Sequence, residues 1–249
     1  MSKTVVLITG ALTGIGRATA LAFAKEGAQI VVSGRRDEAG QALVSELRAM
    51  GAEAEYRRAD VRQEDDVKQL VDSTVARFGR LDVAVNNAGT EGESGPITGQ
   101  SVENFRATFD TNVLGVFLSL KHEMRVMLAQ GSGSIINLSS VAGQAGFPGA
   151  SIYVASKHAV EGLTKTAALE GAEAGVRVNS VAPGPVETDM LDRFTGRESQ
   201  AKANFLAGIP AKRAGEPDEI AQTIVFLASG KAKYLTGQNI AIDGGYTAG

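Results

Sequence analysis

The hydrophobic and polar positions of this chain follow two alternating patterns. Short apolar runs rich in β-branched residues recur along the sequence, and longer stretches with apolar residues at helical spacing lie between them. The apolar runs are Val5–Ile8, Ile30–Val32, Val83–Val85, Ile135–Leu138, Val176–Val178 and Ile240–Ile242. The amphipathic stretches are Arg17–Lys25, Glu38–Met50, Asp65–Phe78, Val113–Leu128, Ala155–Glu170 and Glu219–Leu227. This alternation predicts parallel strands that are joined by helical crossovers.

We therefore expect an α/β fold, a doubly wound parallel sheet with helices on both faces. Because no proline-rich linker or internal repeat interrupts the pattern, residues 1–249 are expected to form a single domain. The stretches 90–99 and 187–210 show neither pattern, and we expect both to be irregular. Both follow expected strands, which places them at the edge where such sheets bind ligands.

The composition argues against several classes of function. Apolar residues make up 43% of the chain and charged residues 21%, which is typical of globular proteins. A net charge of −3 with mixed signs provides no basic stripe, so no nucleic-acid partner is expected. Without cysteine, and with only 2 histidines, the chain is expected to hold neither a disulfide nor a metal ion. No run of about 18 apolar residues occurs, so we expect no membrane span and a cytoplasmic protein.

A glycine-rich turn, Thr9–Gly16, directly follows the first expected strand and opens the first expected helix. Its spacing places Gly10, Gly14 and Gly16 where the backbone must turn tightly and approach a bound pyrophosphate. The helix N-terminus would then attract the negative charge of that group. An ordinary strand-to-helix turn is the alternative, but the position after a strand favours dinucleotide binding.

Tyr153 and Lys157 lie four residues apart at the start of an expected helix, so their side chains share one face. A free phenol has a pKa of about 10, and a nearby ammonium and a nicotinamide cation would both favour the phenolate. Lowering that pKa to about 7 requires roughly 4 kcal/mol. We therefore expect Tyr153 to act as the acid/base of a hydride transfer between a nicotinamide and a carbinol or carbonyl carbon. Taken alone, such a pair is more often a packed aromatic and a solvated charge.

Further motifs occur in order along the chain: Asp60-Val61, Asn86-Asn87-Ala88-Gly89, Asn112, Ser140 and Pro183-Gly184-Pro185-Val186-Glu187-Thr188. Together with the Gly-x-x-x-Gly-x-Gly turn and the Tyr-x-x-x-Lys pair, they resemble the short-chain dehydrogenase/reductase family over essentially the whole chain. The resemblance implies a Rossmann-type sheet of about seven strands and an NAD(P)-dependent oxidoreductase that acts reversibly on a ketone or secondary alcohol. It also implies a homotetramer.

The resemblance assigns roles to individual residues. It implies that Ser140 binds the substrate oxygen, that Lys157 holds the nicotinamide ribose, and that Asn112 holds a proton-relaying water through its backbone. A substrate lid is implied around 187–210, where the apolar residues from Met190 to Leu206 fit a lid and a core stripe equally well. The implied cofactor contacts are Gly10, Thr13, Gly14, Ile15, Gly16, Asp60, Val61, Asn87, Ala88, Gly89, Tyr153, Lys157, Pro183, Gly184, Val186 and Thr188.

The end of the second expected strand bears on the choice of coenzyme. In dinucleotide folds an acid at this point binds the ribose 2′-hydroxyl of NAD, whereas an arginine accommodates the 2′-phosphate of NADP. Here the strand ends in Ser33-Gly34-Arg35-Arg36, which favours NADP(H). Two observations keep NAD(H) as the alternative: Asp37 could neutralise one arginine, and Thr13 stands where relatives that use NADP carry a basic residue.

The sequence does not identify the substrate. A 3-oxoacyl thioester reductase and a sugar (glucose-type) dehydrogenase share this chemistry, and a non-enzymatic dinucleotide sensor is the alternative from another class. The complete set of Asn112, Ser140, Tyr153 and Lys157 argues against a sensor. We interpret Tyr246 as a packing or interface residue. Glu91 could contact a hydroxylated substrate, but solvation of its loop is the favoured interpretation.

Overall fold

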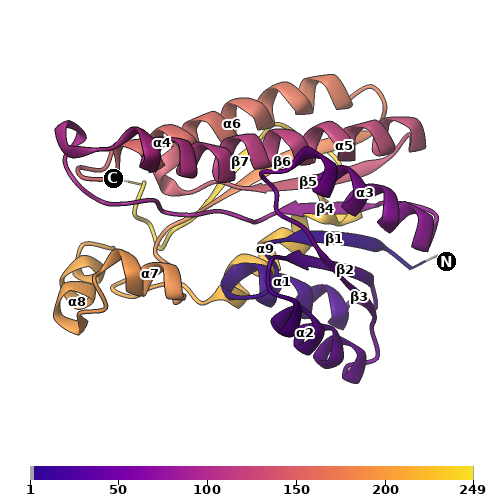
Figure 1. Ribbon diagram of the computed structural model, residues 1–249, viewed down its shortest axis with the longest axis horizontal. Helices are drawn as coiled ribbons and strands as arrows, with labels where there is room; N and C mark the ends of the chain where they lie inside the picture. The colour runs from indigo at the N-terminus through magenta and orange to yellow at the C-terminus, as the bar shows by residue number, and fades with distance from the viewer. Residues whose placement is uncertain (1–2, 249) are drawn as a thin grey trace.

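The computed structural model describes residues 3–248 and contains one parallel sheet of seven strands in the order β3-β2-β1-β4-β5-β6-β7 (Figure 1). From β1 the chain first builds outward to β3 and then returns to the centre to build β4 to β7 on the other side. The strands are β1 (Val5–Thr9), β2 (Gln29–Gly34), β3 (Glu53–Arg58), β4 (Val83–Asn86), β5 (Gly133–Leu138), β6 (Val176–Pro183) and β7 (Asn239–Ile242). The predicted doubly wound parallel sheet is confirmed.

Helices cover both faces of the sheet (Figure 1). One face carries α1 (Gly14–Lys25), α2 (Asp37–Ala49) and α9 (Pro217–Ala228), and the other carries α3 (Glu64–Phe78), α4 (Val102–Phe109), α5 (Gly115–Gln130) and α6 (Ser151–Gly171). Two short helices, α7 (Asp189–Phe194) and α8 (Ser199–Ala207), stand away from the sheet. Across residues 3–248, none of the helices combines the length and apolar character needed to cross a membrane.

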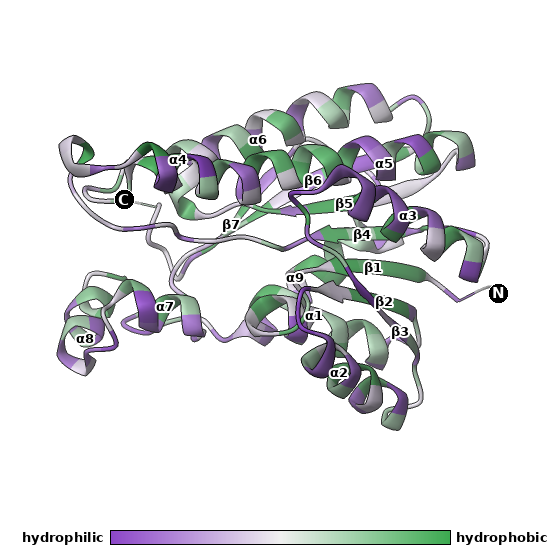
Figure 2. Ribbon diagram, viewed as in Figure 1, coloured by the Kyte–Doolittle hydropathy of each residue, from purple (hydrophilic) through white to green (hydrophobic). Residues whose placement is uncertain are grey.

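The core consists of two apolar layers, one on each side of the sheet. Val6, Ile8 and Ile30 point toward α1 and α9, whereas Leu7 and Val31 belong to the layer beneath α3 and α5. Because both faces are covered, the central strands are apolar at almost every position, as Figure 2 shows for β1 and β4. These continuous apolar runs are the reason that the central strands could be predicted.

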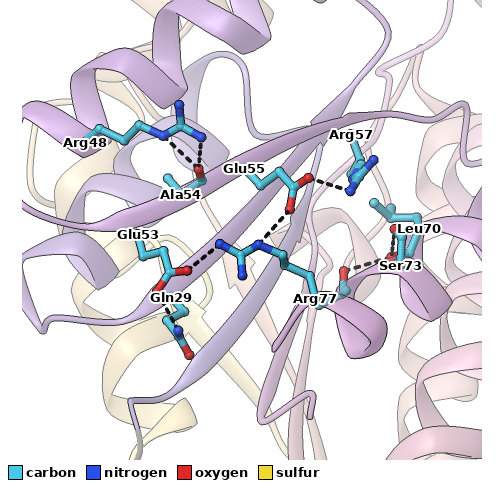
Figure 3. A network of polar contacts seen from close by, with 10 residues as sticks. Gln29, Arg48, Glu53, Ala54, Glu55, Arg57, Leu70, Ser73 and Arg77 are labelled. Carbon is cyan, nitrogen blue, oxygen red and sulfur yellow. Dashed lines mark hydrogen bonds and ion pairs between the residues drawn. The ribbon is translucent and has the colours of Figure 1, made fainter. Parts of the chain in front are cut away.

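The edge strand β3 was not among the predicted apolar runs, because its sequence is mostly charged. Figure 3 shows how its side chains are held: Arg77 of α3 pairs with Glu53 at 2.7 Å, and Gln29 of β2 donates to the same carboxylate at 2.7 Å. Glu55 pairs with Arg57 at 2.5 Å. With only one neighbouring strand, β3 is half exposed, and polar contacts replace the apolar pattern.

Two further expectations about secondary structure were wrong. The stretch 187–210 is not irregular, because it contains α7 and α8, and α4 was not predicted at all. The buried residues of α4 are the polar Asn104 and Thr108, and none of the residues of α8 is buried. Neither helix therefore has the buried apolar stripe by which an amphipathic helix is recognised. The stretch 90–99 is irregular as expected, apart from a 3₁₀ turn at Ile97–Gly99.

Glu123 of α5 is an ionisable side chain that lies in the core, with an exposed fraction of 1%. Within residues 3–248, the hydrogen bond that its carboxylate accepts comes from Asn86 Nδ2, at 2.9 Å. Burial raises the pKa of Glu123 to about 7, because the charged form loses its hydration, and the Asn86 bond offsets this only partly. The folded protein therefore holds a carboxyl group in its interior that is about half protonated at neutral pH.

We expect Glu123→Gln to stabilise the protein above pH 7. The unfolded chain ionises this group near its ordinary pKa of 4.5, so the wild-type free energy of unfolding falls as the pH rises from there to about 7. The pKa difference corresponds to a loss of about 3 kcal/mol, which the variant avoids. Urea unfolding at pH 4.5 and pH 8 measures the difference, with the exposed Glu173→Gln as control. An unaltered pH dependence in Glu123→Gln would contradict this account.

Candidate active site

The turn between β1 and α1 is shaped by three glycines. Gly10 has a φ of +61°, and a Cβ there would lie 2.7 Å from the Cα of Ala88. Gly14 has a φ of +53°, and a Cβ at Gly16 would lie 2.5 Å from Asn87 Nδ2. Thr13 precedes α1, and its side chain makes no capping bond to the helix. The first turn of α1 therefore keeps free N–H groups in a narrow cradle, which fits the phosphates of a dinucleotide.

Two adjoining cavities lie at the carboxyl ends of the strands, and together they contain nearly all the predicted site residues. The dinucleotide cavity is lined by Gly10, Thr13, Gly14, Ile15, Arg35, Arg36, Asp60, Val61, Asn87, Ala88, Gly89 and Thr188. The catalytic cavity, of about 190 Å³, is lined by Ile15, Asn87, Gly89, Ser140, Tyr153, Lys157, Pro183, Gly184, Val186 and Thr188. Because Ile15, Asn87, Gly89 and Thr188 line both, one extended ligand can reach from one cavity into the other. Gly16 and Asn112 line neither.

Tyr153 and Lys157 enter the catalytic cavity from the first turns of α6. Lys157 Nζ lies 5.6 Å from the centre of the Tyr153 ring and donates to the carbonyl of Leu138 at 2.7 Å. Ser140, just after β5, accepts from the N–H of Ala142 at 3.2 Å. Its neighbour Ser139 also lines the cavity, but its hydroxyl donates to Glu161 at 3.0 Å. The two serines thus differ in their partners, and Ser140 is the one that lowers the pKa of Tyr153.

Burial has the largest effect on the pKa of Tyr153. Burial raises it to about 12, a hydrogen bond with Ser140 lowers it by less, and the Glu91 carboxylate raises it further. Burial also lowers the pKa of Lys157 to about 8. In the chain itself burial has the larger effect on both groups. The lowering expected from Lys157 together with a bound nicotinamide cation stays a prediction.

Asn112 is buried and lies in a π-helical turn, Asp110–Leu114, between α4 and α5, rather than at a helix start. Its Oδ1 accepts from the N–H of Thr90 and its Nδ2 donates to the carbonyl of Thr90, both at 2.8 Å. Nδ2 also donates to Ser156 Oγ at 3.0 Å. The side chain thus ties the loop after β4 to the helix that carries Tyr153, while the role expected of its backbone stays a prediction.

The far end of the dinucleotide cavity is basic. Arg35 and Arg36 line it beside Ser33 and Gly34. Asp37 does not neutralise them, because its carboxylate accepts from Arg58 and from the Tyr56 hydroxyl, both at 3.1 Å.

Two charged residues of the dinucleotide cavity were not predicted from the sequence. Arg62 holds Asp60 at 2.6 Å and lowers the pKa of that carboxyl, and Arg193 enters from α7. Arg62, two residues after Asp60, could have been noticed from that spacing.

Much of the lining of the catalytic cavity is apolar, and the sequence did not indicate all of this apolar wall. Phe147 and Tyr246 stack with ring centres 5.8 Å apart, which agrees with the interpretation of Tyr246 as a packing residue, and both rings also line this cavity. Residues of α7 and α8 complete this wall: Met190, Leu191, Phe194 and Phe205. Tyr246 follows the last strand directly, at the ligand-binding edge, which is a signal that could have identified it.

Glu91 lines the same cavity and is not a solvated loop residue as interpreted. Its side chain is 13% exposed, and Arg193 Nε donates to its Oε1 at 2.6 Å. Arg193 also donates to its Oε2 at 3.2 Å. This ion pair joins the loop after β4 to α7.

Comparison with known proteins places the chain among dehydrogenases and reductases. A family model described as "Enoyl-(Acyl carrier protein) reductase" matches residues 10–247. The cyclohexanol dehydrogenase of Acinetobacter sp. (strain SE19) is 42% identical, with coverage of 98% of this chain and 95% of the relative. The 3-oxoacyl-[acyl-carrier-protein] reductase FabG of Staphylococcus epidermidis (strain ATCC 12228 / FDA PCI 1200) is 44% identical, covering 96% of this chain and 97% of the relative.

Solved structures agree with this placement. Levodione reductase superposes with a TM-score of 0.96 at 37% identity, covering 100% of this chain and 99% of its own. ElxO with NADP bound gives a TM-score of 0.93 at 34% identity, covering 99% of this chain and 100% of its own. The resemblance drawn from the motifs is confirmed. The chain belongs to the short-chain dehydrogenase/reductase family and is an NAD(P)-dependent oxidoreductase of alcohol and carbonyl groups.

Proposed function

We propose that this enzyme interconverts a ketone and a secondary alcohol on an apolar, ring-shaped skeleton, with NADP(H) as coenzyme and Tyr153 as acid/base. The observation that carries the proposal is the catalytic cavity itself. Ser140, Tyr153 and Lys157 line it together, and most of the other lining side chains are aromatic or aliphatic. A polar reactive end therefore faces an apolar enclosure, as a cyclic ketone requires.

In the proposed mechanism the Tyr153 hydroxyl gives its proton to the substrate oxygen during reduction and takes it back during oxidation. The Ser140 hydroxyl donates to the same oxygen and stabilises the negative charge that develops there. When bound, the reduced coenzyme would supply the hydride for reduction, and the oxidised coenzyme would place a positive charge near the phenol. Lys157, kept partly dry by burial, adds a cation on the same helix face and holds the nicotinamide ribose. Asn112 holds through its backbone the water that relays protons to solvent.

The remaining predicted cofactor contacts have supporting positions in the structure. The glycine cradle fits the pyrophosphate, Asp60 and Val61 line the dinucleotide cavity that would hold the adenosine half, and Pro183, Gly184, Val186 and Thr188 line the catalytic cavity. For NADP(H) over NAD(H), the support is the pair of arginines, since Asp37, the carboxylate that follows them in the chain, is engaged by Arg58. ElxO, with NADP bound, is a relative of the same fold.

We further propose that residues 187–210 form a lid over the catalytic cavity of a single domain. Phe194, which lines the cavity, is 40% exposed, and α8 has no buried residue, so a lid fits these helices better than a core stripe. The cyclohexanol dehydrogenase supports a cyclic substrate. The 3-oxoacyl reductase supports a thioester substrate as the second candidate.

A spectrophotometric assay tests the proposal. Oxidation of NADPH and of NADH is followed at the reduced-nicotinamide absorbance band with cyclohexanones, open-chain ketones, 3-oxoacyl thioesters and sugars. We expect turnover with NADPH and cyclic ketones. Turnover restricted to thioesters would select the second candidate, and turnover with sugars alone would select a sugar dehydrogenase. Tight NADPH binding without turnover across the panel would favour a dinucleotide sensor.

We also propose that the enzyme is a homotetramer. Large apolar side chains are exposed on the helices that carry Asn112 and Tyr153, among them Phe105 of α4, Phe117 of α5 and Leu169 of α6, the last with an exposed fraction of 82%. Such a surface is typical of an interface. We expect Leu169→Arg to give a smaller species than the wild type in light scattering coupled to size exclusion, whereas Met50→Arg, just after α2, leaves the mass unchanged. A monomeric wild type would contradict the proposal.

A further inference from the structure

We propose that Glu91 and Arg193 form a latch that closes the lid over the catalytic cavity, and that Glu91 is thereby a positioning residue beside Tyr153. The inference rests on the lid and on the role of Tyr153 proposed above. Glu91 belongs to the loop after β4, and Arg193 belongs to α7, 102 residues later in the chain. Their ion pair joins the fixed edge of the sheet to the segment that covers the site.

The geometry of the pair is that of a strong contact. Both carboxylate oxygens of Glu91 accept from the guanidinium, from Nε at 2.6 Å and from the terminal nitrogen at 3.2 Å. The bidentate arrangement fixes orientation as well as distance. The Glu91 side chain is 13% exposed and that of Arg193 is 48% exposed, so the pair is reached by solvent from the lid side. It is thus placed to break when the lid moves outward.

A second ion-pair cluster makes the lid move as a unit. Lys202 of α8 binds Glu187 at 2.6 Å and Asp192 of α7 at 3.0 Å. These bonds tie α8 to the start of the lid and to α7. Release of the single latch at Arg193 would therefore free both helices together from the loop after β4.

The latch lies on the boundary between the two cavities. Glu91 lines the catalytic cavity and Arg193 lines the dinucleotide cavity. The other titratable groups that line the catalytic cavity are Tyr153 and Lys157 of α6 and Tyr246 after β7. Asp189, at the start of α7, is the second carboxylate that faces Arg193. Glu91 is thus the acid of this cavity, and Arg193 is the cation that compensates it.

The position of Glu91 connects lid closure to the chemistry. Its negative charge raises the pKa of Tyr153, in addition to the larger effect of burial. With the latch closed, Arg193 offsets part of that charge. With the latch open, the carboxylate acts on the phenol without compensation, so the proton of Tyr153 is held more tightly. Proton transfer from the phenol is therefore favoured with the lid closed.

Two single variants distinguish this role from a general structural one, because they shift the pH profile in opposite directions. Glu91→Gln removes the charge that holds the Tyr153 proton, so the alkaline limb of kcat/KM for ketone reduction moves to lower pH. Arg193→Gln leaves Glu91 uncompensated, so that limb moves to higher pH. Shifts in the same direction, or no shift in either variant, would overturn the proposal. Glu93→Gln, an equal charge change in the same loop at an exposed side chain, is the matched control.

A second readout needs no turnover. Hydrogen–deuterium exchange of the amides in α7 reports how often the lid opens. We expect the exchange rate to be about fivefold faster in Glu91→Gln and in Arg193→Gln, because each variant loses one partly exposed ion pair. The double variant loses the same ion pair, so we expect its exchange rate to be no faster than that of either single variant. Wild-type rates in both single variants would overturn the latch. If the wild type turned over no substrate, the proposed function would fail, but the exchange rates would still decide whether the latch exists.

Discussion

Tyr153→Phe is expected to bind NADPH as tightly as the wild type and to reduce ketones about 10²- to 10⁴-fold more slowly, the range that a positioned acid/base contributes. The ring stays in place beside Lys157, so the cavity keeps its shape, and the proton donor is lost. Fluorescence titration with NADPH measures the binding, and the absorbance assay measures kcat. Near-full turnover in this variant would exclude Tyr153 as the acid/base.

The matched control is Tyr246→Phe. It removes the same hydroxyl from another tyrosine of the catalytic cavity, one that stacks on Phe147 and has no lysine partner on a helix face. We expect its loss of kcat to be far smaller than that of Tyr153→Phe. Equal losses of kcat in the two variants would show that the Tyr153 hydroxyl has no role beyond that of any other phenol in the cavity.

Arg35→Asp is expected to move the preference of the enzyme from NADPH toward NADH. An arginine that binds a phosphate contributes a charge-assisted bond, and a carboxylate in its place repels the 2′-phosphate and accepts from the ribose 2′-hydroxyl of NAD. We expect the ratio of kcat/KM for NADPH over NADH to fall by about 10- to 100-fold, the range of one such bond. Steady-state kinetics with both coenzymes measure the ratio.

Arg36→Asp separates the contributions of the two arginines, which both line the dinucleotide cavity. A larger change in Arg36→Asp than in Arg35→Asp would assign the phosphate to Arg36. An unchanged ratio in both variants would refute the choice of NADP(H). The Asp37 carboxylate is bound by Arg58 and Tyr56 rather than by either arginine. We therefore expect neither variant to change the charge that Asp37 presents to the coenzyme.

How far the sequence predicts this molecule depends on whether a feature is local in the chain. The central strands were predicted because each is a continuous apolar run, and the glycine turn because its residues follow one such strand. β3 and α4 were missed because their residues are largely charged or polar. These residues are stabilised by contacts with other elements, such as the ion pair between Glu53 of β3 and Arg77 of α3. Such contacts depend on the tertiary structure, so a local sequence pattern does not reveal them.

The same distinction applies to the site. The motif residues lie just after strands and could be predicted to meet at one edge of the sheet. The apolar wall combines Phe147, α7, α8 and Tyr246, whose meeting no spacing in the sequence indicates. The upward pKa shift of Tyr153 in the chain itself could not be predicted for a related reason. Its main cause is the exclusion of water from the phenol, and the degree of burial is known only once the fold is known.

The charged edge strand has a consequence for how copies of this chain can associate. A sheet can grow when a strand of another molecule adds to its edge, and such growth leads to aggregation. A strand adding beside β3 would have to fit against Glu53, Glu55 and Arg57, whose charges are already paired across the sheet surface. The β3 edge is therefore expected to resist continuation of the sheet. It leaves association to other surfaces, such as the helix faces proposed above, where symmetry limits the number of subunits and an assembly can close.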